Sequence, residues 1–223
     1  LYELWKSWGI IPDIVMGHSL GEYAAACAAG IMTWEEGLKI VAQRAKLMQT
    51  LPQYGTMVAV FAEAAQIKEA LAKQASEVVI AAVNGKQHFV LSGRKAEVEA
   101  VVAILEIQGI KTKLLKVSHG FHSPLMEPML AEFSQILTKF TFAAPKIDIV
   151  SNLTGEIATA DITTPAYWCR QILEPVQFAA GMESLRQQGC SLFIEIGANP
   201  TLVGMGIRCL PENTYGWLPS LRQ

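Results

Sequence analysis

The chain has 223 residues, of which 51% are hydrophobic, and its net charge at pH 7 is −2. This composition is typical of a folded domain with a well-filled core, and it gives no basis for nucleic-acid binding through bulk charge. No apolar run reaches the ~18–20 residues of a membrane span, and no signal-peptide pattern is present at the start.

Residues 1–9 are predicted to form the last turns of an amphipathic helix. Gly9 has the position of a C-terminal cap, after Trp8. The sequence starts inside this helix and without an initiator methionine. We therefore expect it to be a fragment of a longer protein.

A strand, a sharp turn and a helix are predicted around Ser19. The apolar residues 13–16 precede Gly17-His18-Ser19-Leu20-Gly21, a G-x-S-x-G pattern, and a helix of small residues follows over 21–30. At such an elbow the serine hydroxyl is lifted clear of the sheet, and glycines on either side avoid clashes of Cβ atoms. The N–H groups at the start of the helix stabilise negative charge that develops there. A chance match in a glycine-containing loop is the alternative, but this context favours Ser19 as a nucleophile.

A second helix is predicted from about residue 34 to residue 51. Thr33 and Glu36 form a capping box at its start, and Pro52 ends it. Arg44 falls in the centre of the apolar stripe of this helix rather than on its polar face. An arginine there either extends its charged end to solvent or meets an anion, because a buried, unpaired guanidinium is costly.

Residues 55–117 are predicted to form a ferredoxin-like β-α-β-β-α-β subdomain. It is inserted into a larger α/β body made of residues 1–54 and 118–223. The pair Asn84-Gly85 is typical of a two-residue hairpin turn. The predicted strands are 56–61, 77–83, 87–92 and 110–117, and the predicted helices are 64–73 and 95–108.

The body resumes at residue 118, and a helix is predicted to begin after His122, with Ser123 as N-cap and Pro124 at its first position. This places His122 at a strand-to-helix junction, where active-site residues of open α/β sheets gather. A serine nucleophile needs a base, and His119 and His122 are the candidates. No aspartate stands in a hydrolase-like order, so a carbonyl is expected to orient the imidazole. Later in the chain, helices are predicted over 164–173 and 179–188 and a strand over 191–196. A final helix is predicted after residue 200.

Three motifs carry a resemblance to a known family. They are residues 17–23 (GHSLGEY), 43–48 (QRAKLM) and 119–126 (HGFHSPLM). They resemble the acyltransferase domains of modular type I polyketide synthases and are similar to malonyl-CoA:acyl-carrier-protein transacylases. The resemblance covers essentially the whole chain. It implies an α/β-hydrolase-like body with a parallel sheet and an inserted ferredoxin-like subdomain.

The resemblance implies a catalytic role for each matched residue. Ser19 would be acylated, and His122 would act as the general base and acid. The main-chain carbonyl of Gln171 would orient that histidine, and the Leu20 N–H would donate to the oxyanion. Arg44 would bind the free carboxylate of a malonyl-type acyl group, because a guanidinium pairs with a carboxylate through two hydrogen bonds.

The resemblance also implies an acyl-binding pocket. His18 is expected to line it, together with His119 and Phe121 of the run His-Gly-Phe-His. This run is similar to the His-Ala-Phe-His signature of malonyl-selective domains, whereas methylmalonyl-selective relatives carry Tyr-Ala-Ser-His. A phenylalanine in place of serine leaves less room for an α-methyl branch, so malonyl is the expected acyl group.

The expected activity is transfer of a malonyl unit from malonyl-CoA, through a Ser19 acyl-enzyme, to the phosphopantetheine thiol of an acyl carrier protein in polyketide or fatty-acid biosynthesis. Flanking ketosynthase and other synthase domains are the expected partners within a parent chain. No permanently bound cofactor is expected, and neither nucleic acid nor a membrane is an expected partner. A serine esterase or thioesterase and an inactive truncated docking domain remain alternatives; Arg44 within the apolar stripe argues against the esterase.

Two further expectations concern the whole protein. The family's first strand and the glutamine-bearing loop that completes its oxyanion hole have no counterpart here, so we expect an N-terminal truncation and assign activity to the intact parent. The four cysteines, Cys27, Cys169, Cys190 and Cys209, lie far apart without a C-x-x-C pair. This spacing excludes a disulfide scaffold and a zinc site, and it indicates a reduced, cytoplasmic protein with no bound metal.

Overall fold

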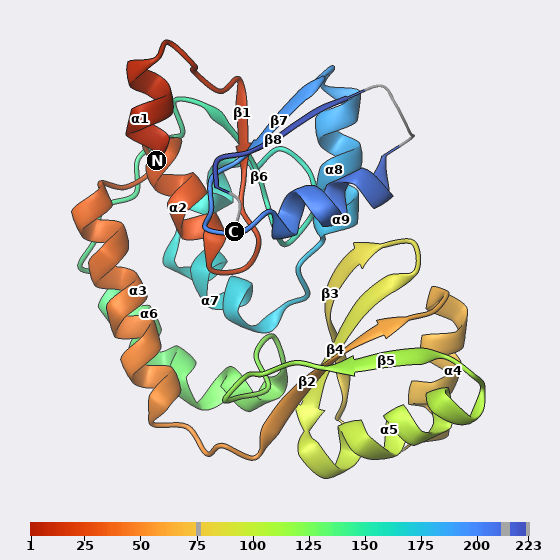
Figure 1. Ribbon diagram of the computed structural model, residues 1–223. Helices are drawn as coiled ribbons and strands as arrows, with labels where there is room; N and C mark the ends of the chain where they lie inside the picture. The colour runs from red at the N-terminus through yellow and green to blue at the C-terminus, as the bar shows by residue number, and fades with distance from the viewer. Residues whose placement is uncertain (75–76, 211–214, 222–223) are drawn as a thin grey trace.

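The first quarter of the chain forms three helices and a short strand. In the computed structural model, which describes residues 1–74, 77–210 and 215–221, the order is α1 (Tyr2–Ser7), β1 (Ile14–Met16), α2 (Gly21–Ala28) and α3 (Trp34–Gln49) (Figure 1). The predicted capping box starts α3, where the Thr33 hydroxyl accepts from the Glu36 N–H and the Glu36 carboxylate accepts from the Thr33 N–H. The small side chains of α2 let it pack closely, and Ala26 and Ala29 are fully buried.

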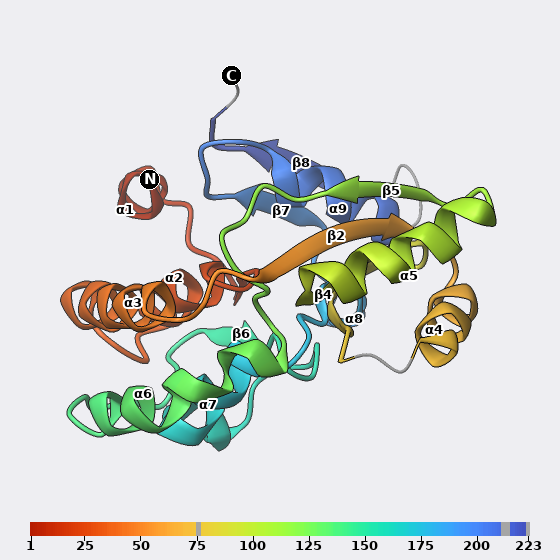
Figure 2. The ribbon, with the colours of Figure 1, turned by 90° about the horizontal axis from the view of Figure 1, so that it is seen from below.

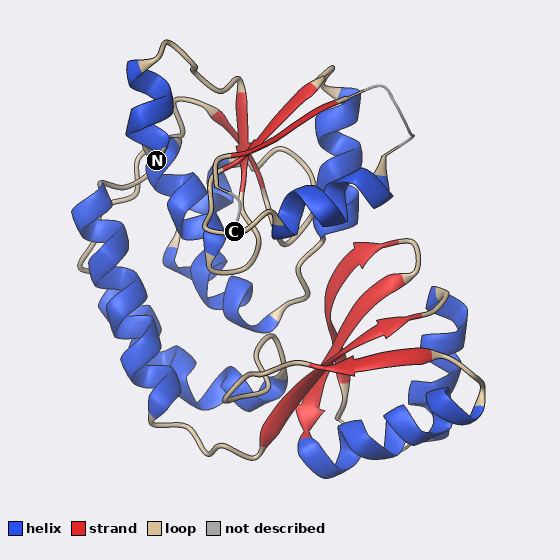
Figure 3. Ribbon diagram, viewed as in Figure 1, coloured by secondary structure: helices blue, strands red, loops and turns tan. Residues whose placement is uncertain are grey.

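The next segment folds into a four-stranded antiparallel sheet. Its order is β3-β4-β2-β5, and α4 and α5 cover one face (Figures 1 and 3). This is the strand order of a ferredoxin-like unit, as the sequence indicated. The elements are β2 (Gly55–Phe61), α4 (Ala64–Lys73), β3 (Val79–Gly85), β4 (His88–Arg94), α5 (Lys95–Ile107) and β5 (Lys111–Leu114).

Both faces of this small sheet are covered, which explains the unbroken apolar run of β2. Val58 and Val60 pack against the helices of the unit. Met57 points to the other face and joins a core that includes Val150 and Phe178 of the body. The inserted unit and the body therefore share a hydrophobic core.

The hairpin turn between β3 and β4 lies two residues later than predicted. Gly85 pairs with His88, so Lys86 and Gln87 form the turn and Asn84 remains in the strand. Tertiary contacts hold Asn84 there, because its side chain binds His18 and its carbonyl accepts from the thiol of Cys209. The local Asn-Gly preference is overridden by these contacts.

The rest of the chain completes the body. It contains two separate two-stranded parallel sheets, β1 with β6 and β7 with β8. The sequence analysis did not predict β6 or β8, which have three and four residues. The elements are η1 (Pro124–Met129), α6 (Leu130–Leu137), β6 (Asp148–Val150), η2 (Ala160–Thr163), α7 (Pro165–Leu173), α8 (Phe178–Gln187), β7 (Leu192–Glu195), α9 (Thr201–Cys209) and β8 (Gly216–Pro219).

A second core lies between α2, α3, α6 and α7, which Figure 2 shows as adjacent layers. Its centre is aromatic, with Tyr23, Phe133, Tyr167 and Trp168 almost completely buried. The Trp168 indole still donates a hydrogen bond, to the Ile162 carbonyl at 3.0 Å. None of the helices in the described ranges is long and apolar enough to cross a membrane.

The turn between β1 and α2 has the predicted elbow shape, but its two glycines differ. A Cβ atom on Gly17 would lie 2.2 Å from the Glu22 nitrogen and from the Gly21 carbonyl carbon, whereas a Cβ on Gly21 would meet nothing within 4 Å. Ser19 between them has φ of 52°, in the left-handed region. The turn therefore requires glycine at position 17 and does not require it at position 21.

We expect Gly17→Ala to lower the free energy of unfolding by about 2–3 kcal/mol, because its Cβ meets rigid backbone that must shift. Gly21→Ala is the matched control and should change stability by less than about 1 kcal/mol, in the stabilising direction, because alanine favours a helix. Chemical denaturation of both variants measures the difference. Equal destabilisation by the two changes would contradict this account of the turn.

Candidate functional site

Ser19 and His122 meet although 103 residues separate them in the chain. The Ser19 Oγ lies 2.6 Å from the His122 Nε2. Ser19 comes from the elbow, and His122 comes from the loop before η1. Both have positive φ values, 52° and 54°, and they are the two non-glycine residues with this conformation in the described ranges. Strained backbone of this kind clusters at functional sites.

The other imidazole nitrogen is held by a main-chain carbonyl. His122 Nδ1 donates to the Glu174 oxygen at 2.9 Å. The prediction that the Gln171 carbonyl has this role is wrong, because Gln171 lies inside α7, where carbonyls follow the helix axis. Glu174 is the first residue after α7 and has extended backbone, with ψ of 156°. Pro175 after it was the available signal, since a residue before proline avoids the helical conformation.

His122 is neutral at ordinary pH. Its imidazole is 4% exposed, and burial lowers its pKa to about 4. The hydrogen bond to Glu174 opposes this shift, while the charge of Arg44 lowers the pKa further. A neutral imidazole with Nδ1 protonated leaves Nε2 free to accept the proton of the Ser19 hydroxyl.

Arg44 is buried, and no acidic side chain of the described residues forms an ion pair with it. Its side chain projects from α3 and is 8% exposed, so it does not extend to solvent. Its guanidinium carbon lies 5.8 Å from the centre of the Tyr23 ring, and its Nε makes no hydrogen bond to any described residue. Burial lowers the pKa of this guanidinium, yet an arginine remains charged in proteins. The site therefore contains a buried positive charge.

His18 connects the elbow to the small sheet. One ring nitrogen, Nε2, lies 2.8 Å from the Asn84 Oδ1, and the ring packs on Phe178. Since the amide oxygen only accepts, His18 Nε2 carries the proton. Burial lowers the pKa of His18, so it too is neutral.

His119 does not take part in the serine–histidine pair. It is 2% exposed, and its Nε2 and Nδ1 bind the Leu51 carbonyl and the Ser118 hydroxyl. Its ring lies 5.8 Å from the half-buried ring of Phe121. Of the two candidate bases, only His122 reaches Ser19.

Asn152 is a site residue that the sequence reasoning missed. Its Oδ1 accepts from the Ser19 N–H at 2.7 Å, and its Nδ2 donates to the Gly17 carbonyl at 2.9 Å. It follows β6, a strand that the sequence analysis did not predict. Its position among polar residues directly after a strand is the one sequence signal for a functional role. Ligand-binding residues gather at the carboxyl ends of parallel strands.

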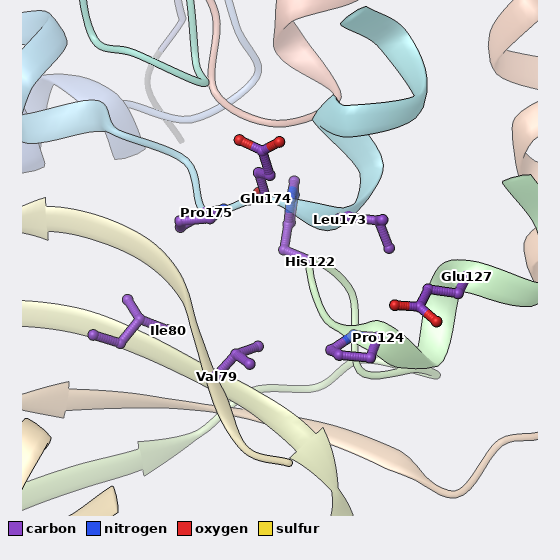
Figure 4. Close-up of a pocket in the computed structure, with 8 residues that line it drawn as sticks. All are labelled: Val79, Ile80, His122, Pro124, Glu127, Leu173, Glu174 and Pro175. Carbon is purple, nitrogen blue, oxygen red and sulfur yellow. Dashed lines mark hydrogen bonds between the residues drawn. The ribbon is translucent and has the colours of Figure 1, made fainter. Parts of the chain in front are cut away.

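A cavity of about 210 Å³ opens beside His122 (Figure 4). Side chains from β3 line one side, and residues of η1 and of the segment after α7 line the others. Its walls are mainly apolar and include Val79, Ile80, Pro124, Leu173 and Pro175. The cavity thus lies between the small sheet and the body.

Comparison with known proteins identifies the family. The acyl transferase domain model matches residues 1–221. The spectinabilin polyketide synthase system protein NorB of Streptomyces orinoci is 43% identical over 213 residues, which are 95% of this chain and 10% of that protein. The chain therefore spans about a tenth of that relative.

Solved structures agree with this result. The acyltransferase domain from the second module of the salinomycin polyketide synthase is 42% identical, with a TM-score of 0.95 over 100% of this chain and 52% of that one. A malonyl-transacylase solved with its type II polyketide acyl carrier protein is 27% identical, with a TM-score of 0.92 over 100% of this chain and 74% of that one. The chain belongs to the acyl transferase domain family, and it is similar to the acyltransferase domains of polyketide synthases, as its three motifs indicated.

Proposed function

We propose that this acyltransferase moves a malonyl group from malonyl-CoA to the phosphopantetheine thiol of an acyl carrier protein, through an ester on Ser19. The observation that carries the proposal is the buried Arg44 guanidinium, whose Nε bonds to no described residue and whose charge lowers the pKa of His122. A malonyl group ends in a carboxylate, which supplies the missing anion. The related structures include a malonyl-transacylase in complex with its acyl carrier protein, which supports the same proposal.

In the first half-reaction the Ser19 oxygen attacks the thioester carbonyl while His122 Nε2 removes its proton. The tetrahedral oxyanion is stabilised by the Leu20 N–H. When it collapses, the carbon–sulfur bond breaks, and His122 returns the proton to the departing coenzyme A thiolate. The malonyl group then remains on Ser19 as an ester.

In the second half-reaction the carrier-protein thiol takes the place of the coenzyme A thiol. His122 accepts its proton, the sulfur attacks the ester carbonyl, and the proton returns to Ser19 as the carbon–oxygen bond breaks. The histidine is neutral before and after each half-reaction, because it returns every proton that it accepts. A thioesterase would instead admit water to this ester, so the lifetime of the acyl-enzyme separates the two activities.

The acyl pocket favours malonyl over methylmalonyl. Phe121 is half-buried and packs against His119, whose ring nitrogens are both occupied by protein groups. The phenyl ring therefore has limited room to move. We propose that it excludes an α-methyl branch and that His18 helps to line the pocket.

Ser19→Ala should abolish acyl-enzyme formation, because no other hydroxyl in the described part of the chain bonds to His122 Nε2. Mass spectrometry after exposure to malonyl-CoA should find the malonyl adduct on the Ser19 peptide of the native protein and none in the variant. Ser7→Ala, on exposed α1, is the control. An adduct on another residue would refute the role of Ser19, and rapid loss of the adduct to water would indicate a thioesterase.

Arg44→Ala should reduce malonyl transfer relative to acetyl transfer by about 10²-fold or more, because truncating one partner of a buried charge pair costs about 2–5 kcal/mol. Acetyl transfer should be spared, since acetyl has no carboxylate. Arg44→Lys should rescue malonyl transfer only in part, because an ammonium cannot form the two parallel hydrogen bonds. Lys46→Ala, an exposed position on the same helix, is the control. An unchanged malonyl-to-acetyl ratio in Arg44→Ala would contradict the carboxylate role.

The acylation rate should be nearly constant from pH 5.5 to 7.5. His122 must be deprotonated to act, and with its pKa lowered to about 4 it remains so across this range. A histidine with an ordinary pKa near 6.5 would instead lose about tenfold in rate on going down to pH 5.5. Single-turnover acylation measures the profile, and Glu22→Gln removes the buried carboxyl whose pKa burial raises to about 7. A step near pH 6.5 in both proteins would contradict the assignment of His122.

A further inference from the structure

A side chain of α7 forms a hydrogen bond with the peptide unit between Ser19 and Leu20. The Ser19 carbonyl accepts from the Gln171 Nε2 at 2.8 Å, in addition to the Glu22 N–H at 3.0 Å that starts α2. A peptide unit is planar and trans, so its C=O and N–H point in opposite directions. The group that holds the Ser19 oxygen therefore also decides where the Leu20 N–H points.

The Leu20 N–H is free to serve a substrate. Within residues 1–74, 77–210 and 215–221 it donates to no acceptor. Gln171, on the opposite side of the same peptide, is 1% exposed, and its Oε1 has no partner among these residues. Only the NH₂ of an amide can face a carbonyl oxygen, so the orientation of this amide is determined.

We propose that the Gln171 side chain is a positioning residue for acyl transfer, which aims and polarises the Leu20 N–H through the Ser19 carbonyl. This rests on the proposed function, in which the Leu20 N–H receives the oxyanion. A hydrogen bond to the carbonyl oxygen makes the N–H of the same peptide a stronger donor, and the effect is larger in a buried, low-dielectric site. Gln171 itself touches no reacting atom.

The peptide unit before Ser19 also forms a hydrogen bond with a side-chain amide. Both peptide units that flank Ser19 are therefore held in place. Asn152 Oδ1 accepts the Ser19 N–H, and the Asn152 N–H in turn donates to the fully buried carboxylate of Glu22 at 2.8 Å. A left-handed serine costs about 1–3 kcal/mol and persists only where the surroundings impose it. Asn152 imposes the conformation of Ser19, and Gln171 sets the direction of the next N–H.

The C-terminal end of α7 therefore orients both the histidine base and the oxyanion donor. Gln171 and Glu174 are three residues apart, so they lie on the same side of the chain as it leaves the helix. The Glu174 carbonyl orients His122, and the Gln171 amide orients the oxyanion donor. A shift of this helix end would disturb the base and the oxyanion donor together.

The test compares Gln171→Met, Gln171→Glu and the control Ile172→Val in the full chain. Gln171→Met removes the donor at similar volume and should lower the maximal acylation rate by about 10- to 100-fold, less than the ~10²–10³ for deleting an oxyanion donor outright. KM should stay within about twofold, because the interaction strengthens in the transition state. Ile172→Val disturbs the same buried helix turn without a polar change and should leave both constants unchanged.

Gln171→Glu gives a signature that a purely structural role would not produce. Burial raises the pKa of a carboxyl group, so the introduced side chain is protonated at lower pH and can donate its O–H to the Ser19 oxygen. At higher pH it becomes a carboxylate and repels that oxygen. Acylation by Gln171→Glu should therefore fall as pH rises, whereas the native rate is flat and the Gln171→Met rate is low and flat.

The outcomes separate this proposal from the proposed function. If native protein forms no Ser19 adduct, the proposed function fails before Gln171 is tested. If native protein forms the adduct and Gln171→Met forms it at the native rate, the positioning role is refuted. If Gln171→Met unfolds, Gln171→Glu decides: a falling pH profile supports the role, and a flat one refutes it.

Discussion

A serine in left-handed backbone conformation is the constraint on which the rest of the site depends. The φ of 52° at Ser19 turns its hydroxyl out of the β1–α2 turn and toward His122. An L-residue does not adopt this conformation without compensation. The compensation comes from the missing Cβ of Gly17 and from the amides of Asn152 and Gln171, which bind the two peptides that flank the serine. The nucleophile is thus held by a local glycine and by amides from two distant parts of the chain.

The small sheet helps to position the catalytic histidine. The Val176 N–H donates to the Ala81 carbonyl and the Val83 N–H donates to the Val176 carbonyl, both at 2.9 Å, so the segment after α7 is added to the edge of β3. This segment follows directly on Glu174, whose carbonyl orients His122. The orientation of the histidine therefore depends on how the inserted unit is attached to the body.

Burial has opposite consequences for the two basic side chains of the site. It keeps His122 neutral, which suits a base, whereas Arg44 stays charged with an Nε that bonds to no described residue. A carboxylate in place of the Glu174 carbonyl would orient the histidine equally well, but it would add a negative charge near Arg44 and compete with an anionic substrate. A neutral carbonyl fixes the imidazole and leaves the guanidinium available.

The sequence by itself determined the elements whose signals are local: the elbow at Ser19, the capped helix with Arg44 in its apolar stripe, and the order of strands and helices in the inserted unit. The motifs determined the family. Tertiary structure decided what depends on contacts between distant residues. It selected Glu174 over Gln171 as the partner of His122, kept Asn84 in a strand, and brought Asn152 beneath the serine. These choices depend on the direction in which a carbonyl or amide points after the chain has packed, and neither composition nor spacing contains that direction.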